Sequence, residues 1–205
     1  MRRVRYAVAM SLDGYIAGPK GEADWIVMDP EIDFRAIFAQ FDTLLVGRRS
    51  YEAMAGYGGG GGMFSGMKVL VLSRTLKQAD HPKVTIVSRR VPETIGALRK
   101  EPGKDIWLFG GGELFRSLLE LNLVDAVEVA VIPALLGGGI PLLPSPAHRA
   151  KLELTRHRVY AKTGTVSLEY AVKRSRRRPR SAAPTLEADG ERLQPAQDRA
   201  LSPAQ

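Results

Sequence analysis

The stretch Leu108-Phe-Gly-Gly-Gly-Glu-Leu-Phe115 decides the fold prediction. It ends the apolar run Asp105–Phe109, which is typical of a buried strand, and it opens a helical segment from Glu113 to Leu121. Glycines between a strand and a helix let backbone N–H groups approach an anion, and the helix dipole favours negative charge there. A tight packing turn would use the same glycines. Taken alone, the stretch therefore predicts a phosphate-binding turn or a packing turn.

Two further strand ends have residues that suit a phosphate. Gly47-Arg-Arg-Ser50 follows the short apolar run Thr43–Gly47, and Ser73-Arg74 follows the run Lys68–Ser73. A guanidinium and a hydroxyl beside a helix start are good partners for phosphate oxygens, although Ser50 would also serve as a helix cap and Arg49 as a solvated charge. Because open α/β sheets bind ligands beyond their strand ends, three such junctions in one sheet favour a phosphate-containing ligand.

Apolar runs alternate with helical segments through residue 121, which predicts a largely parallel sheet. The expected strands and helices up to that point are 4–10, 33–41, 43–47, 50–55, 68–73, 83–88, 91–98, 105–109 and 113–121. The pattern then changes to consecutive strands, expected over 125–132, 151–160 and 165–173. The last two face each other across the turn Ala161–Gly164. We therefore predict an α/β fold whose mostly parallel central sheet ends in antiparallel edge strands.

The predicted helix from Asp33 to Phe41 has apolar residues at the i, i+3, i+4 and i+7 positions of one face. Asp29 is a candidate cap for this helix, and Asp33 is expected to face solvent. The glycine run from Gly58 to Gly62 is expected to form a loop.

Composition limits the function classes. The chain has 205 residues and no cysteine, which excludes disulfides and thiolate chemistry, and its three histidines are too far apart in sequence to suggest a metal site. Half of the net charge of +8 lies in residues 173–205, which hold eight Lys/Arg and four Asp/Glu. We expect one folded domain over 1–173 and a disordered tail over 174–205 that is basic and then Pro/Ala-rich. We also expect a cytoplasmic location and no nucleic-acid or membrane partner.

Several motifs, in order, resemble one family. They are Ala9–Ala17, Leu45–Glu52, Val71–Arg74, Trp107–Phe115 and Leu123–Gly137. Together they resemble the reductase family shared by dihydrofolate reductase and the C-terminal domain of the bifunctional riboflavin-biosynthesis deaminase-reductase, over roughly residues 3–173. The resemblance implies a dihydrofolate-reductase-like three-layer α/β/α fold and an NADPH cofactor. The stretches Ser-Leu-Asp-Gly-Tyr-Ile-Ala and Pro-Ala-Leu-Leu-Gly-Gly-Gly are closer to the riboflavin branch.

The resemblance also implies roles for matching positions. Arg48 and Ser50, beside Gly47, would hold cofactor phosphate, and Ser73 and Arg74 would surround the adenosine 2′-phosphate. The pyrophosphate would lie on the turn Gly110, Gly111, Gly112, Glu113, Leu114 and Phe115, and a non-proline cis peptide between two of these glycines is expected. Main-chain groups of Ala9 and Ile16 would meet the nicotinamide carboxamide, and the loop from Asp13 to Trp25 would fold over the ring.

The substrate is less well defined than the cofactor. The resemblance implies hydride transfer to a small heterocycle of the 5-amino-6-(5-phosphoribosylamino)uracil type. The alternatives are a pterin substrate, or a cofactor-binding regulatory protein without turnover. Glu31 is the candidate catalytic carboxylate, and Asp13, Trp25 and Glu31 are the candidate substrate contacts. Relatives are often dimeric, and the edge strand between Lys151 and Lys173 is a candidate homodimer surface.

Overall fold

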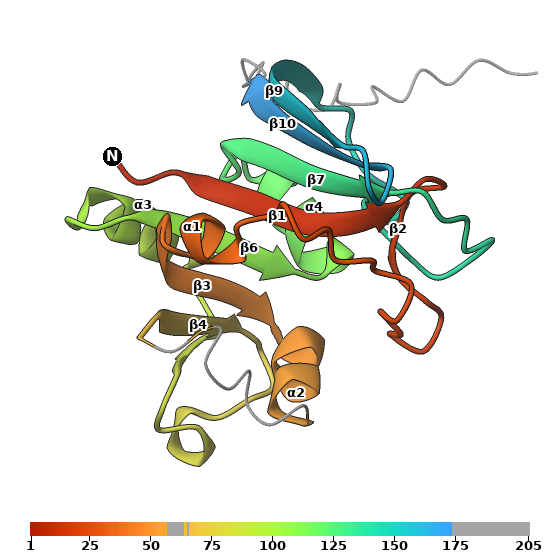
Figure 1. Ribbon diagram of the computed structural model, residues 1–205. Coiled ribbons are helices and arrows are strands. Elements are labelled where there is room, and N and C mark those ends of the chain that lie inside the picture. The colour runs from red at the N-terminus through yellow and green to blue at the C-terminus, as the bar shows by residue number, and fades with distance from the viewer. Residues whose placement is uncertain (57–63, 65, 174–205) are drawn as a thin grey trace, which may run out of the picture. The chain divides into compact units, whose positions relative to one another are not determined.

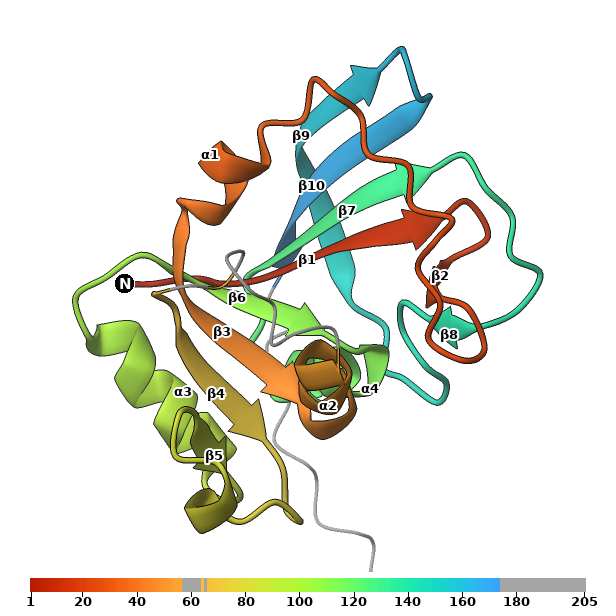
Figure 2. The same ribbon diagram turned by 60° about the horizontal axis from the view of Figure 1, so that its bottom comes forward.

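A computed structural model describes residues 1–56, 64 and 66–173 of the chain. Within these residues, eight strands form one sheet in the order β5-β4-β3-β6-β1-β7-β10-β9, and β2 pairs with β8 in a separate two-stranded sheet. Neighbours from β5 to β7 are parallel, whereas β10 is antiparallel to both β7 and β9. Figures 1 and 2 show this sheet in two views. The predicted mostly parallel sheet with antiparallel edge strands is confirmed.

The elements follow the predicted order closely. The strands are β1 (Val4–Ser11), β2 (Tyr15–Ala17), β3 (Phe41–Gly47), β4 (Lys68–Leu72), β5 (Thr85–Val87), β6 (Asp105–Gly110), β7 (Ala126–Ile132), β8 (Ile140–Pro141), β9 (Lys151–Tyr160) and β10 (Thr165–Lys173). The helices are α1 (Phe34–Phe38), α2 (Arg48–Gly56), α3 (Val91–Lys100) and α4 (Gly112–Glu120), with a 3₁₀ turn at Gln78–Asp80.

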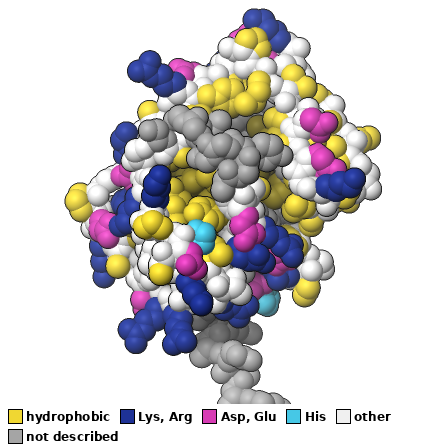
Figure 3. Space-filling model, turned by 90° about the horizontal axis from the view of Figure 1, so that it is seen from below, with side chains coloured by type: hydrophobic (Ala, Val, Ile, Leu, Met, Phe, Trp, Pro, Cys, Tyr) yellow, Lys and Arg dark blue, Asp and Glu magenta, His cyan; other side chains and the backbone are white. Residues whose placement is uncertain are grey.

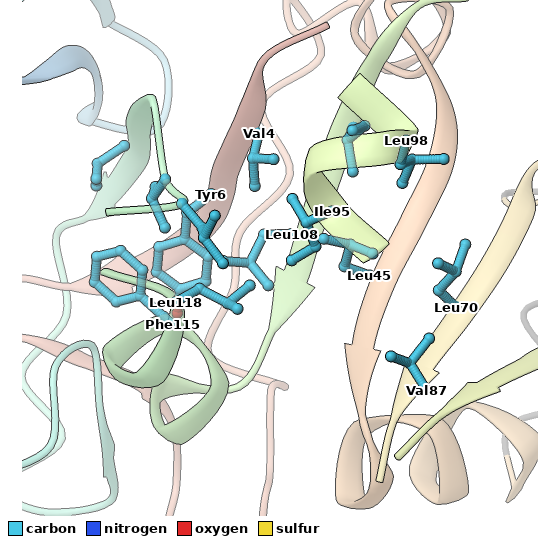
Figure 4. Packing of buried hydrophobic residues seen from close by; sticks show 14 of the residues in the cluster. Val4, Tyr6, Leu45, Leu70, Val87, Ile95, Leu98, Leu108, Phe115 and Leu118 are labelled. Carbon is cyan, nitrogen blue, oxygen red and sulfur yellow. The ribbon is translucent and has the colours of Figure 1, made fainter. Parts of the chain in front are cut away.

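One face of the sheet is covered by α3 and α4. Ile95 and Leu98 from α3 and Phe115 and Leu118 from α4 are buried against Val4, Tyr6, Leu45 and Leu108 of the strands. Figure 4 shows these side chains meeting between sheet and helices. The rings of Tyr6 and Phe115 stack with centroids 4.1 Å apart and planes 13° from parallel. This packing fixes where α4 begins.

The opposite face packs under α1 and α2 around aromatic side chains. Trp107 of β6 stacks with Phe38 and Phe41, each 5.3 Å away between ring centroids, and its indole N–H donates to the Ala7 carbonyl. Helices on both faces of the sheet give the predicted three layers.

The first helix is shorter than predicted. It covers only Phe34–Phe38, and Phe41 begins β3 instead, with 3% of its surface exposed. Phe41 continues the helical spacing, but a buried place in the sheet stabilises it as a strand residue, so tertiary packing overrides periodicity. The capping prediction was also wrong, because the Asp33 carboxylate accepts the Ala36 N–H. Asp29 is buried and accepts hydrogen bonds from the Glu31 N–H and the Thr163 hydroxyl instead.

Sequence patterns also missed β2 and β8, which have three and two residues. The glycine run 58–62 and the tail 174–205 lie outside the described residues. No helix among the described residues is long and apolar enough to cross a membrane.

Candidate cofactor and substrate site

The glycine turn after β6 lies where two strand-to-helix junctions converge. β3 and β6 are neighbours in the sheet, and a Cβ on Gly47 would lie 3.8 Å from Leu114 Cβ, so α2 and α4 begin close together at the carboxyl ends of these strands. The Ser50 hydroxyl oxygen lies 3.8 Å and 3.7 Å from where Cβ atoms on Gly110 and Gly111 would stand. A Cβ on Gly47 would lie 3.9 Å from the Gly110 carbonyl oxygen. The two phosphate-suited motifs are therefore one cluster.

Each glycine of the turn has its own geometry. Gly110 has a φ of +149°, which side-chain residues rarely adopt, and the Gly110–Gly111 peptide is cis, as expected. A Cβ on Gly112 would lie 2.5 Å from the Pro141 carbonyl oxygen and 2.9 Å from Pro144 Cδ. Gly112 is therefore needed for packing against the end of β8 and the segment that follows it. A Cβ on Gly110 or on Gly111 would have only the Ser50 hydroxyl oxygen within 4 Å, so this side of the turn has room next to Ser50.

The start of α4 offers backbone donors at this place. Gly111 occupies the N-cap position, and no side chain caps the helix there. The first N–H with an acceptor inside the helix is that of Phe115, which donates to the Gly111 carbonyl oxygen. The N–H groups of Gly112, Glu113 and Leu114 belong to the helix turn that has no internal acceptors. The Phe115 side chain lies in the core, and Glu113 pairs with Arg116 at 2.7 Å. Any ligand here would meet main-chain groups.

Arg48 and Ser73 already have partners in this structure. Arg48 is exposed on α2 and forms an ion pair with Glu52 at 3.1 Å. The Ser73 hydroxyl accepts the N–H groups of Thr75 and Leu76 at 3.2 and 3.1 Å. Ser73 thereby fixes the turn after β4 that presents the exposed Arg74. The Ser73 hydroxyl also lies 3.3 Å from the Thr75 hydroxyl, so the exposed Arg74 guanidinium is the group of this turn that a further phosphate would meet first.

Asp13 joins two loops at the end of β1. Its carboxylate accepts hydrogen bonds from the Ser11 hydroxyl at 2.6 Å, the Gly137 N–H at 2.7 Å and the Leu136 N–H at 3.1 Å. These hydrogen bonds, led by that of Ser11, hold the pKa of Asp13 below its ordinary value. Asp13 therefore orders the β1–β2 turn next to the 133–139 loop.

The main-chain candidates Ala9 and Ile16 lie on β1 and β2 on either side of that turn. Trp25 is half-buried, and its indole N–H donates to the Glu22 carbonyl at 3.2 Å.

The carboxylates near α1 differ from each other. Asp29 is 2% exposed and accepts the Glu31 N–H and the Thr163 hydroxyl, both at 2.8 Å. Burial alone would raise the pKa of Asp29, but these hydrogen bonds and the charge of Lys162 lower it below its usual value. Glu31 is half-exposed and pairs with Arg158 at 3.5 Å and Lys162 at 3.4 Å. Asp29 thus fastens this segment to the β9–β10 turn, which the sequence did not indicate.

An aromatic wall adjoins the glycine turn. Phe109 directly precedes Gly110, and its ring meets those of Trp107 and Phe64 edge-on, with centroids 5.3 and 5.0 Å apart. The sequence patterns predict Trp107 and Phe109 only as strand residues and place Phe64 in no element. In Figure 3, hydrophobic side chains gather in the middle of the face seen from below, with Lys and Arg around them. Among the described residues, no group of three or more His, Asp and Glu could hold a metal ion.

Comparisons with known proteins agree with this geometry. The family model of the RibD C-terminal domain matches residues 2–166. The uncharacterized Bacillus subtilis protein YyaP is 33% identical over 179 residues, which cover 82% of this chain and 94% of YyaP. A putative riboflavin biosynthesis protein from a Shewanella species is 27% identical with a TM-score of 0.71, covering 85% of this chain and all of that one.

A more distant solved structure shows the fold. Dihydrofolate reductase from Enterococcus faecalis, complexed with NADP(H), has a TM-score of 0.60 and 17% identity, covering 84% of this chain and 97% of that one. At this identity the likeness shows a common fold alone. The dihydrofolate-reductase-like architecture predicted from the motifs is confirmed.

Proposed function

The chain belongs to the family of the RibD C-terminal domain, and we propose on this premise that it is an NADPH-dependent oxidoreductase that transfers a hydride to a small heterocyclic substrate. The family resemblance read from the motifs is confirmed, and it supports a reductase of the riboflavin-pathway family. The observation on which the cofactor proposal rests is the single cluster formed by Gly47, Ser50 and the turn 110–112.

The residues of this cluster fit the pyrophosphate of a dinucleotide. Gly110 and Gly111 have only the Ser50 hydroxyl oxygen near the places where a Cβ would stand, and the first-turn N–H groups of α4 are donors without helical acceptors. Arg48, at the start of α2, would supply a positive charge after exchanging its partner Glu52 for a phosphate. These residues bind and orient; the nicotinamide, when bound, supplies the hydride.

Ser73 and Arg74 would select NADPH over NADH. The turn that Ser73 orders presents Arg74 just beyond β4, beside β3 and hence beside the phosphate cluster. A guanidinium binds a phosphate dianion in a fork, which the unphosphorylated ribose of NADH would not offer.

We propose a substrate of the 5-amino-6-(5-phosphoribosylamino)uracil type. The partly buried rings of Phe109 and Phe64 lie edge-on next to the cofactor turn, over the buried Trp107, and this apolar surface suits a flat heterocycle. A pterin reductase is second, because Glu31, its candidate carboxylate, is half-exposed and pairs with Arg158 and Lys162. Binding of cofactor without turnover is the third reading.

Thermal unfolding of the full chain tests the cofactor. NADPH at about one hundred times its Kd should stabilise the protein by about 2.7 kcal/mol, or raise Tm by roughly 5–10 °C, and NADH at the same concentration much less. Arg74→Ala should lower the affinity for NADPH at least roughly tenfold and leave that for NADH unchanged. Arg149→Ala, which removes another exposed arginine, is the matched control. No shift with millimolar NADPH would disprove the proposal.

Consumption of NADPH tests the substrate. 5-Amino-6-(5-phosphoribosylamino)uracil should be reduced, and dihydrofolate should not. Reduction of dihydrofolate alone would establish the pterin reading. Tight NADPH binding without oxidation across both compounds would support the third reading and leave the cofactor proposal intact.

A further inference from the structure

A row of three small side chains leads from β1 across the main sheet to an arginine on β9. Directly paired residues of neighbouring strands lie on the same face of a sheet, so the strand registers define the row. Its members, in order from β1 to β9, are Ala9, Ala130, Ser167 and Arg158. Arg5 pairs with Trp107, and Ala9 lies four positions after Arg5, so the row shares its face with the aromatic rings. Figure 2 shows β1, β7, β10 and β9 in this order.

The row is accessible although it crosses the middle of the sheet. Ala9 and Ala130 belong to strands with a strand neighbour on each side, yet both residues are only half-buried, as is Ser167. Adjacent strands are about 4.8 Å apart, so the three steps from Ala9 to Arg158 span about 14 Å. A ligand that begins at Ala9, the candidate nicotinamide contact, and follows the row therefore ends at Arg158.

The end of the row is basic, and its geometry is fixed by packing. The Arg158 guanidinium stacks on the ring of Tyr160, 4.5 Å from its centroid, and Tyr160 is itself buried. Lys162 follows in the β9–β10 turn, which the hydrogen bond from Thr163 to Asp29 fastens to the segment before α1. A guanidinium held on an aromatic ring keeps its orientation, and its planar fork matches the oxygens of a phosphate monoester.

Glu31 occupies these two cations only loosely. Its carboxylate lies 3.5 Å from Arg158 and 3.4 Å from Lys162, and the three side chains are between 47% and 64% exposed. Ion pairs as exposed as these contribute little to stability. The other carboxylate near Lys162, that of Asp29, is buried and already accepts two hydrogen bonds at 2.8 Å. Glu31 is therefore the group that an incoming anion would displace.

On the basis of the proposed reductase function, we propose that Arg158 and Lys162 bind the phosphate monoester of a substrate whose heterocycle lies over Ala9 and Ala130. Glu31 leaves the two cations when this phosphate arrives. A compound without an anionic group at that end leaves the Glu31 pairs in place and gains nothing from the two cations. The competition between Glu31 and the phosphate therefore makes the site selective for a phosphorylated substrate over the same compound without phosphate.

NADPH oxidation by the full chain tests this selectivity. The two compounds are 5-amino-6-(5-phosphoribosylamino)uracil and the same molecule without its phosphate. Arg158→Ala should raise KM for the phosphorylated compound at least roughly tenfold and leave KM for the other unchanged. Lys151→Ala, which removes an exposed cation at the opposite end of β9, is the matched control and should change neither. Equal KM values for the phosphorylated compound in the parent and Arg158→Ala would overturn the phosphate site and leave the reductase function standing.

Calorimetric titration in the presence of excess NADP⁺ separates binding from turnover, because the oxidised cofactor has no hydride to transfer. Arg158→Ala should weaken binding of the phosphorylated compound at least roughly tenfold. Glu31→Gln should tighten it roughly 2–10-fold, because it removes the competing charge. A purely structural ion pair predicts the opposite sign for Glu31→Gln. Since both side chains are half-exposed, Tm without ligand should change little in either variant.

The titration also distinguishes the two levels of the proposal. Binding that depends on Arg158 and on the phosphate, without oxidation of NADPH, would support the phosphate site and refute the reductase. Equal binding by the parent, Arg158→Ala and Glu31→Gln would overturn the phosphate site, whatever the outcome for turnover. So would equal affinity of the parent for the two compounds.

Discussion

Tyr6 is a fully buried tyrosine whose hydroxyl lacks a hydrogen-bond partner within the described residues. Its ring stacks on Phe115 and helps to seat α4, so the ring is useful and the hydroxyl is costly. A buried polar group without a partner costs about 1–3 kcal/mol. Tyr6→Phe keeps the ring and removes that cost. Allowing for the small void that the lost oxygen leaves, the variant should be about 1 kcal/mol more stable, with a Tm roughly 2–4 °C higher.

The same burial adds a pH signature. Burial raises the pKa of Tyr6 well above its ordinary value of 10.0. Above pH 10 the unfolded chain therefore releases a proton that the folded chain keeps, so stability falls as pH rises. That loss, up to about 1.4 kcal/mol per pH unit, should be absent from Tyr6→Phe. The advantage of the variant over the parent should thus widen above pH 10.

Urea unfolding at pH 7 and at pH 11 measures both effects. Tyr15→Phe, at a half-buried position on β2, controls for loss of a tyrosine hydroxyl and should change stability at pH 7 by less than about 0.5 kcal/mol. If Tyr6→Phe were 1 kcal/mol or more less stable than the parent at pH 7, the hydroxyl would have a partner and the reasoning would be wrong.

Three further substitutions test the site. Gly112→Ala should cost about 1–3 kcal/mol in urea unfolding, because its Cβ would lie 2.5 Å from the Pro141 carbonyl oxygen; an unchanged midpoint would contradict this packing. Asp29→Asn should remove a stability contribution that is present above pH 3.8 and lost as pH falls through the lowered pKa, so an acid-unfolding curve unchanged from the parent would refute it. Ser50→Ala should weaken NADPH binding roughly 2–10-fold in a fluorescence titration and leave Tm without ligand unchanged; equal affinity would separate Ser50 from the cofactor.

The strands were predictable because their signal is local. A buried parallel strand is a short continuous apolar run, and the runs that became β3, β4 and β6 are bounded by glycine, serine or charged residues. Where a residue satisfied two patterns, local reasoning failed. Phe41 matches both a helix face and a strand, and only the available place beside Trp107 decides between them.

The glycine, arginine and serine motifs at the strand ends could be recognised from the sequence. That the motif at Gly47–Ser50 meets the turn after β6 was implied only by the family resemblance. Gly111 is far along the sequence from Gly47 and Ser50, and nothing local states that β3 and β6 are neighbours. The same holds for Asp29, whose partner Thr163 lies 134 positions away. Such contacts depend on strand order, which periodicity does not encode.

By itself, therefore, the sequence determined which segments are strands and helices and which strand ends have groups suited to phosphate, because apolar spacing, glycines and arginines act locally. Only the tertiary structure decided which of these strand ends meet. It also decided which carboxylate is buried and which glycine of the turn has no room for a side chain, because burial and close approach depend on residues brought together from distant parts of the chain.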